Sequence, residues 1–524
     1  MFSLAVLSAS QVFGSDQIRK NWPQAAGPLG TWQVPGDNVP VDWSVSLNKN
    51  VLWKTALPEG GQSTVIVWGD RLFVITHKPW PVDADPKLKP TGADIDGYCL
   101  DSLSGDILWS VRLPSIREMK YTGIYSDSTS PSPVSDGEFV WFFNASGMMG
   151  CWDFKGNEIW TRKWQPRMRH HSRQFEPILF GDEILNVEVL DKEAAKKTAM
   201  HKKLPPGEDP KKYWTFLHGI DKRTGKVKWV AEAGTAIHNT PTFGRLADGS
   251  PAILHGRGGG HAPPEMPYGP SLTSLSSAKV GKTLWHYPIV GGSSHYTSSW
   301  NSKYACWFHG GNHLVLDAQT GKLLRKQPLE KNVTYTYFDS ETNKYRTKHN
   351  TTLRIRRGKA NSTPSTNEAN LLVGNHHYFL THESHCIGRV NIESGKAEYL
   401  QVPVQVVRKA GQEENVLWGV ALENDTRNSR GIDIGVVDKR SKGDGWGHVS
   451  AASPIAVGSK IFLPTMVGMV YVIDANAQKL DQSALLAIND LGPAGETWSL
   501  SSLSYANGKV YHRSMKGVVC IGRE

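Results

Sequence analysis

The sequence contains few cysteines, and none of them is close to another. Five occur in 524 residues, and the shortest gap between two is about fifty positions: Cys99, Cys151, Cys306, Cys386 and Cys520. The absence of CxxC and CxxCH spacings excludes a zinc ribbon and c-type haem attachment. Cys99, Cys151 and Cys520 stand in apolar, strand-like contexts, which predicts buried free thiols.

Long apolar runs are also missing. No internal run approaches the ~18 residues that a membrane-spanning helix needs, so we expect no transmembrane segment. The first 14 residues are mostly apolar and give way to polar Ser15-Asp16, like the core and cleavage region of a secretory signal, although the usual basic start is absent. We therefore expect residues 1–15 to be a signal segment and the protein to be exported, to the periplasm or the cell surface.

The excess of positive charge is not organised into a binding motif. The formal net charge is +10, but the lysines and arginines are scattered and no nucleic-acid-binding pattern is present. We interpret them as a solvated basic surface and expect no nucleic-acid partner. The 19 tryptophans, 51 glycines and 30 prolines indicate many turns between short strands.

What is present is a repeat of the form Asp-x-x-x-Gly-x-x-x-Trp. Full copies start at Asp101 and Asp221, a copy one residue shorter starts at Asp153, and more degenerate copies start at Ser277, Asp317, Asn391 and Asp474. A long repeat with variable spacers is typical of solenoids, propellers and arrays. In each copy the Asp can accept hydrogen bonds from turn amides and the Gly can take the left-handed turn conformation.

The repeat around Asp153 is the clearest example of one structural unit. Strand-like segments at 130–134, 138–144, 148–153 and 158–164 are separated by short turns. The near-continuous apolar run of the second segment suggests a sheet covered on both faces. Four antiparallel strands joined by tight turns make a propeller blade.

The same reading places eight blades in an all-β fold. The first seven cover about 62–113, 130–164, 174–234, 238–292, 295–331, 361–404 and 448–489, with insertions at about 191–212, 332–359 and 409–444. The eighth has three strands, at 496–504, 509–512 and 518–521. We predict that Val51–Leu57 supplies its fourth strand and closes residues 16–524 into one ring, because this pairing removes an exposed edge. A seven-blade count remains an alternative.

The tryptophans of the repeat have a predicted structural role. They fall on the fourth strand, where a large ring can reach the neighbouring blade and still find a partner for its indole N–H. This assignment covers Trp53, Trp109, Trp160, Trp229 and Trp285.

These repeats resemble those of the quinoprotein-type, or PQQ-like, β-propellers, and the resemblance extends over nearly the whole chain from Trp22. That superfamily includes PQQ-dependent alcohol dehydrogenases and the outer-membrane assembly lipoprotein BamB. The segment Asn21-Trp-Pro-Gln-Ala-Ala-Gly-Pro28 is similar to the start of many exported PQQ-like proteins of planctomycete-type bacteria. The resemblance implies the fold more than an activity.

Resemblance to a quinoprotein dehydrogenase implies three features: PQQ bound over a tryptophan floor, a disulfide between adjacent cysteines, and a calcium ion held by Glu, Asn and Asp. This chain has no adjacent cysteines, and no motif assigns calcium ligands or a catalytic residue. No cofactor is therefore assignable, and PQQ with calcium belongs only to an alternative, a PQQ-dependent alcohol or sugar dehydrogenase. We expect instead a non-catalytic binding or scaffold protein, and a monomer.

Candidate binding residues stand just before or within each innermost strand, where propeller loops surround a central funnel. They are polar or aromatic, and four are histidines, which suit a metal or an anionic ligand but also ordinary hydrogen bonding to loop backbone: Gln62, Asp127, His171, His238, His295, Asn361, His448 and Trp498. The ligand is a protein or a small molecule, and the insertions are the alternative surface for a protein partner.

Overall fold

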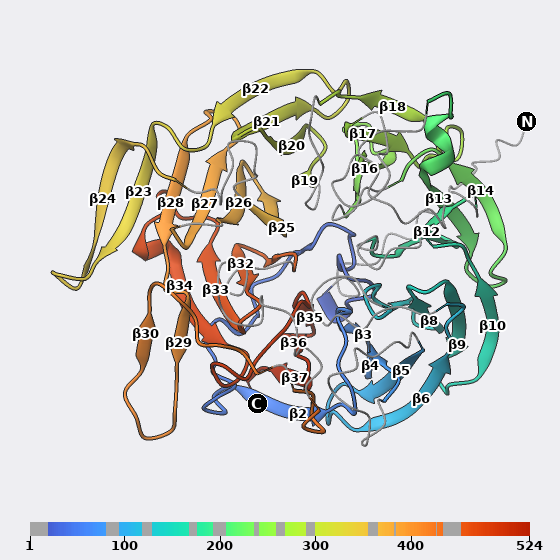
Figure 1. Cartoon of the computed structure of the whole chain (residues 1–524), viewed down its shortest axis with the longest axis horizontal. Helices are drawn as coiled ribbons and strands as arrows, with labels where there is room; N and C mark the ends of the chain where they lie inside the picture. Colours follow the sequence, from blue (N-terminus) through green and yellow to red (C-terminus); the bar gives the residue numbers. More distant parts are fainter. Residues whose placement is uncertain are drawn as a thin grey trace, which may run out of the picture.

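The computed structural model is a ring of β-sheets arranged around a central axis (Figure 1). It describes residues 19–79, 94–117, 128–166, 175–191, 206–234, 240–257, 268–289, 299–354, 365–381, 384–425, 427–432 and 452–523, with the backbone alone at 365–368. No helix in these ranges is long and apolar enough to cross a membrane. The expected signal segment, residues 1–15, lies outside them.

The first five blades are four-stranded antiparallel sheets, each in chain order from the axis outward. Blade 1 contains β3 (Ile66–Trp68), β4 (Arg71–His77), β5 (Ile95–Asp101) and β6 (Ile107–Leu113). Blade 2 contains β7 (Val134–Ser135), β8 (Phe139–Asn144), β9 (Met148–Asp153) and β10 (Glu158–Lys163). Blade 3 contains β11 (Ile178–Phe180), β12 (Glu183–Val189), β13 (Thr215–Asp221) and β14 (Val227–Ala231), with a 3-10 turn, η1 (Pro210–Tyr213), before β13. Blade 4 contains β15 (Thr242–Arg245), β16 (Pro251–Arg257), β17 (Gly269–Ser274) and β18 (Thr283–His286), and blade 5 contains β19 (Ser299–Trp300), β20 (Tyr304–His309), β21 (Asn312–Asp317) and β22 (Leu323–Pro328).

The last three blades carry additions. Blade 6 contains β25 (Ser365–Val373), β26 (His376–Thr381), β27 (Cys386–Asn391) and β28 (Ala397–Gln401), extended outward by β23 (Val333–Asp339) and β24 (Lys344–Thr351). Blade 7 contains β31 (Ile455–Val457), β32 (Lys460–Pro464), β33 (Met469–Asp474) and β34 (Leu485–Asp490), preceded at the axis by β1 (Gln33–Val34); η3 (Gln482–Ala484) leads into β34. A separate hairpin, β29 (Gln405–Val407) with β30 (Asn415–Leu417), lies between blades 6 and 7 in the chain.

Blade 8 closes the ring as the sequence predicts. Its strands β35 (Ser504–Ala506), β36 (Lys509–Arg513) and β37 (Gly517–Ile521) are completed by β2 (Val51–Ala56) from the N-terminal part of the chain. β2 pairs antiparallel with β37, with Thr55 opposite Val518. The edge of β37 is thereby covered, and the eight-blade count is confirmed.

Burial follows the position of each strand in its blade. β8, a second strand, is buried along nearly its whole length, as its continuous apolar run predicts, because sheets pack on both of its faces. β10, a fourth strand, alternates between exposed and half-buried residues because only one face packs against the ring. The core is therefore a series of layers between neighbouring blades.

The repeat motif joins one blade to the next at the tryptophan. The Trp109 indole nitrogen donates to Phe154 O at 3.0 Å, and a Cβ on Gly156 would lie 3.1 Å from the Trp109 ring. The same contact recurs where Trp53 donates to Ser102 O, Trp160 to Lys222 O and Trp285 to Ala318 O. In each case the acceptor is the carbonyl of the residue that directly follows the aspartate of the neighbouring blade's motif.

Trp229 does not make this contact, which corrects the docking role assigned to it. Its indole nitrogen donates to Glu183 Oε2 within its own blade at 2.8 Å, and its ring covers Gly219. The next blade carries the degenerate motif that starts at Ser277, and there Gly281 meets Ala231 in place of a tryptophan.

Candidate functional site

The two ends of the propeller axis differ. Every inner strand begins at one end, here called the entry end, and finishes at a tight turn at the other, the turn end. Residues 21–34 run across the turn end. Trp22 pairs with Val67 of blade 1, the Ser135 N–H of blade 2 donates to Pro23 O at 2.9 Å, and β1 pairs with β31 of blade 7.

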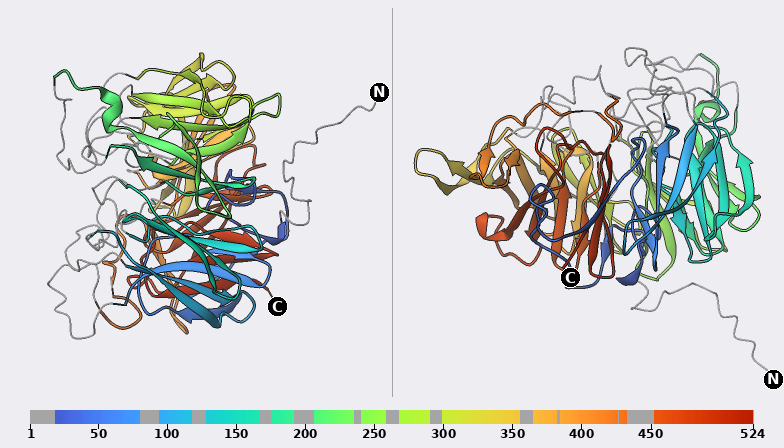
Figure 2. Two further views of the ribbon diagram at one scale, coloured as in Figure 1. Left: turned by 90° about the vertical axis from the view of Figure 1, so that its right-hand side faces the viewer. Right: turned by 90° about the horizontal axis from the view of Figure 1, so that it is seen from below.

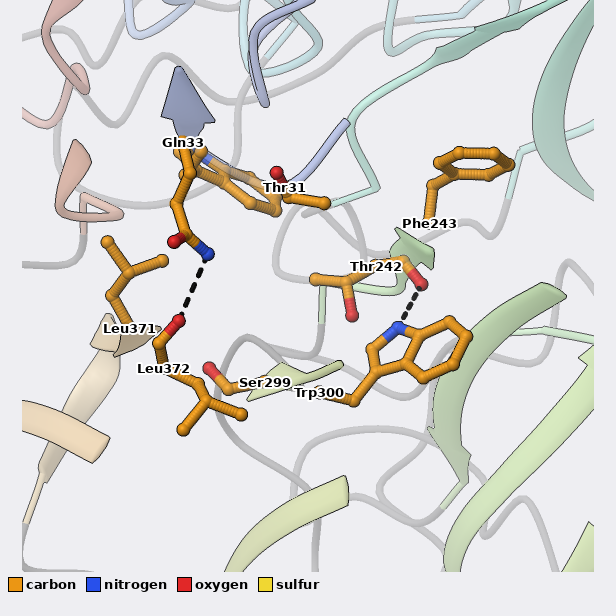
Figure 3. A pocket seen from close by; sticks show the side chains of 9 residues that line it. Thr31, Gln33, Thr242, Phe243, Ser299, Trp300, Leu371 and Leu372 are labelled. Atoms are coloured by element: carbon orange, nitrogen blue, oxygen red, sulfur yellow. Dashed lines mark hydrogen bonds between the residues drawn. The ribbon is translucent and has the colours of Figure 1, made fainter. Parts of the chain in front are cut away.

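The same segment reaches two more blades. The Leu179 N–H of blade 3 donates to Gln24 Oε1 at 2.8 Å. Gln33 Nε2 donates to Leu372 O of blade 6 at 3.0 Å (Figure 3). Between residues 31–33 and blades 4 to 6 there is a cavity of about 20 Å³, enough for roughly one water molecule. At the turn end the N-terminal segment thus acts as a plug.

The entry end is lined by backbone and hydroxyl groups that connect neighbouring blades. The Gln62 N–H donates to Thr129 Oγ1 at 2.9 Å, and the Thr64 N–H donates to Ser132 Oγ at 2.8 Å. Ser501 Oγ of blade 8 donates to the Ser63 carbonyl of blade 1 at 2.9 Å. Short polar residues before each inner strand therefore join blades 8, 1 and 2 at this end.

Glu176 adds a titratable group to the entry end. It stands just before β11 and accepts a hydrogen bond from the Ser132 N–H at 2.8 Å. Burial raises the pKa of the Glu176 carboxyl to about 7, although the hydrogen bonds from Ser132 act in the opposite direction. The residue as a whole is half-buried. A carboxyl that changes charge near neutrality suits proton exchange or the binding of a cation.

A second buried carboxylate, Glu59, is already paired. It is fully buried, accepts from Asn428 Nδ2 at 2.5 Å, and lies 3.9 Å from Arg430 Nη1. Nearby, the buried Arg513 donates from Nη1 to Ile75 O at 2.5 Å. The residues that follow the β29–β30 hairpin are thus anchored to the junction of blades 8 and 1, where the ring closes.

The candidate residues chosen from the sequence divide into two groups. Six lie outside the described residues: Asp127, His171, His238, His295, Asn361 and His448. Gln62 is half-buried and contacts blade 2 through its backbone. Trp498 is buried beside Met466 and Met515. Their convergence on one ligand stays a prediction.

Sequence reasoning missed Glu176, although a signal existed. It stands two residues before an inner strand, as Thr64 and Ser132 do, and it is followed by a proline. The candidates at these positions include one carboxyl, Asp127, but not Glu176. Its unusual pKa depends on burial, which the sequence does not show.

Several histidines that the structure describes are buried inside blades. Burial lowers the pKa of His255, His313 and His512 to about 3, so all three are neutral. His313 of blade 5 lies against His377 of blade 6, with 2.9 Å between Nε2 and Nδ1. One donor atom from each of these two and from Cys306 lies within 4.8 Å of the others.

Solved structures share this architecture, whereas no family model and no curated protein matches the sequence. The quinohemoprotein alcohol dehydrogenase from Comamonas testosteroni aligns over 98% of this chain and 82% of its own, with a TM-score of 0.53 and 12% identity. The chain is an eight-bladed β-propeller, and this dehydrogenase shares its fold. A europium-containing methanol dehydrogenase aligns over 95% and 90% (TM-score 0.50, 12% identity), and BamB from Moraxella catarrhalis over 90% and 96% (0.45, 11%). At these identities the propeller fold is shared with the two dehydrogenases, and no activity follows from it.

The residues that the structure describes do not fit a PQQ–calcium centre. The five cysteines are buried and unpaired, so no disulfide is available to cover a quinone. Among the described residues, the cluster with the geometry to hold a metal is a thiol with two imidazoles, whereas calcium requires oxygen ligands.

Proposed function

We propose that this protein is an exported, non-catalytic propeller that holds a protein partner on a platform built from its insertions. The platform is defined as the β23–β24 hairpin, the β29–β30 hairpin and residues 418–422. Export is proposed from the apolar start of the sequence. The observation that carries the proposal is that two insertions are folded and fixed to each other on the outside of the ring, where they extend outward from blades 6 and 7 (Figure 1).

Aromatic stacking joins the two hairpins. Trp418, just after β30, stacks on Phe338 of β23 with 4.2 Å between ring centres and 5° between the planes. Tyr345 of β24 meets the Trp418 ring edge-on at 6.0 Å. Such pairs contribute about 0.5–1.5 kcal/mol beyond the area they bury. The two insertions therefore form one ordered unit.

Hydrogen bonds and an ion pair hold this unit to the ring. β23 pairs in parallel with β28 of blade 6, and Gln401 Oε1 accepts from the Phe338 N–H at 3.0 Å. Arg408, the residue after β29, donates to Asp490 Oδ2 at 3.1 Å and to Ile488 O at 2.8 Å, both in blade 7. A surface fixed in this way loses little conformational entropy when a partner binds.

The exposed side chains indicate the chemistry of the partner. Val416, Val420 and Leu422 are 38%, 67% and 43% exposed within seven residues, which gives an apolar strip. The exposed strand β24 also carries Lys344, Arg346 and Lys348, of which Arg346 is paired with Asp339 at 2.6 Å. The expected partner presents an apolar contact.

The experiment compares capture by three forms of the tagged protein expressed in its source cells. A protein partner should co-purify with the tagged wild type and should be lost from the double variant Val420→Asp, Leu422→Asp. Leu103→Asp on blade 1 is the matched control, because Leu103 is 62% exposed and lies outside the platform. Equal melting temperatures would show that all three are folded. Identical capture by the platform variant and the wild type would refute the proposal.

A second candidate function is the binding of a small cationic ligand at the entry end, and Glu176 is the observation that favours it. With the turn end plugged, such a ligand reaches the axis from the entry end. Binding that falls steeply below pH 7 in wild type and is lost in Glu176→Gln would support it.

The enzymatic alternative has its own test. Purified protein is mixed with PQQ and calcium and examined for quinone absorbance and alcohol-dependent dye reduction. The proposal expects neither signal, and turnover would replace the non-catalytic assignment.

A further inference from the structure

A cluster of potential metal ligands lies buried between blades 5 and 6, remote from the platform. Cys306 is on β20, His313 on the adjacent strand β21, and His377 on β26 of the next blade. Their exposed fractions are 2%, 0% and 1%, and one donor atom of each lies within 4.8 Å of the other two. Three donors from two blades therefore converge on one point in the core.

The hydrogen bonds around the cluster fix the protons on both imidazoles. Ser299 Oγ donates to Asn370 Oδ1 at 2.7 Å, and the same amide oxygen lies 2.9 Å from His377 Nε2. An amide oxygen only accepts, so His377 carries its proton on Nε2. Its Nδ1 is then an acceptor, and the His313 Nε2–H donates a hydrogen bond to it at 2.9 Å.

This assignment leaves His313 with an unused lone pair. Its Nδ1 is unprotonated, buried, and has no hydrogen-bond partner within the part of the chain that is described. Buried polar atoms are nearly always satisfied, and an exception calls for an explanation such as an ion. A metal ion bound to the cluster would give His313 Nδ1 the partner that the hydrogen bonds do not supply.

The chemistry of the donors and their surroundings selects the kind of ion. A thiolate with neutral imidazoles favours a soft ion over calcium or magnesium. Phe308 stacks on His377 with 4.9 Å between ring centres, and Val315 and Leu372 pack with Cys306, so the site is apolar. In apolar surroundings a net charge is costly. A monovalent ion with one thiolate is neutral, whereas Zn²⁺ would leave one positive charge and an unfilled fourth position.

We propose that Cys306, His313 and His377 bind one Cu(I) ion between blades 5 and 6. On binding, the Cys306 thiol releases its proton to solvent and the thiolate sulfur bonds to copper. The two imidazoles coordinate as neutral ligands, and the hydrogen bond between them gives way to nitrogen–copper bonds. No electron is transferred, and copper remains Cu(I).

The test uses the full-length protein, purified metal-free with reduced thiols and titrated without oxygen with Cu(I) held by bicinchoninate. We expect one Cu(I) per chain to leave the coloured chelate. Cys306→Ser should weaken this uptake by more than about 100-fold, since changes to outer-shell partners alone cost 10–100-fold. Cys151→Ser is the matched control, because Cys151 is also a buried free thiol but lies in blade 2.

X-ray absorption on the copper-loaded wild type keeps the proposal testable if Cys306→Ser fails to fold. One sulfur and two imidazole nitrogens around copper would support the site. Three outcomes would overturn it: no withdrawal of Cu(I) from bicinchoninate, equal uptake after Cys306→Ser, or a stoichiometric preference for Zn²⁺ that excludes Cu(I).

Discussion

Replacing Glu176 by glutamine should stabilise the folded protein above neutral pH and leave its stability unchanged near pH 4. The ordinary pKa of a glutamate is 4.5, and burial raises that of Glu176 to about 7 in the folded chain. Between these values the unfolded chain loses this proton before the folded chain does. The folded state therefore loses stability as pH rises from about 4.5 to 7.

The size of the effect follows from that interval. Each pKa unit corresponds to about 1.4 kcal/mol. The difference between a pKa of 4.5 in the unfolded chain and about 7 in the folded chain therefore limits the loss of folding free energy to about 3 kcal/mol. We expect about 1–3 kcal/mol at pH 8. Glutamine does not ionise and keeps an oxygen that can accept the hydrogen bond from the Ser132 N–H.

The assay is the urea midpoint of wild type and Glu176→Gln at closely spaced pH values from 4 to 9. The difference between the two proteins should be zero near pH 4, grow between pH 4.5 and 7, and stay constant above. Glu158→Gln, at an exposed position on β10, controls for the loss of one negative charge. Parallel curves for wild type and Glu176→Gln would refute the reasoning about Glu176.

Three further predictions concern the ring itself. Gly225→Ala should cost about 1–3 kcal/mol more in urea unfolding than Gly249→Ala, because both have positive φ but only at Gly225 would the new Cβ meet the Trp160 ring, at 2.7 Å. Equal costs would contradict the docking role of Trp160. Trp22→Ala should lower the free energy of unfolding by about 3–5 kcal/mol, since Trp22 is fully buried in the plug; a loss below 1 kcal/mol would contradict that role. Deletion of Val51–Leu57 should sharply lower the melting temperature, because it exposes the edge of β37, and an unchanged melt would argue against ring closure.

Most of the fold could be predicted because its signals are local and repeated. Each Asp-x-x-x-Gly-x-x-x-Trp copy specifies one turn and one outer strand. The blades can therefore be counted even where the copy is degenerate. The fourth strand of blade 8 was predictable because three strands with a bare edge require a partner. The exception, Trp229, depends on the motif of the next blade, where Ser277 replaces the aspartate.

The remaining features depend on contacts between distant parts of the chain. Nothing near Trp22 indicates that it pairs with Val67 or that residues 33–34 pair with β31. The sequence shows that the insertion at 332–359 is polar, but it does not indicate the pairing with β28 or the stacking of Trp418 on Phe338. The pKa of Glu176 and the cluster around Cys306 likewise arise only when neighbouring blades come together.

The most direct test of the central proposal, a partner-binding platform, is site-specific photo-crosslinking in the source cells. A photoreactive amino acid is placed at Val420 on the platform or at Leu103 on blade 1, two apolar positions with 67% and 62% exposure. The account predicts a discrete covalent adduct with another protein from position 420 that is absent from position 103. No adduct from position 420, or the same adducts from both positions, would contradict it.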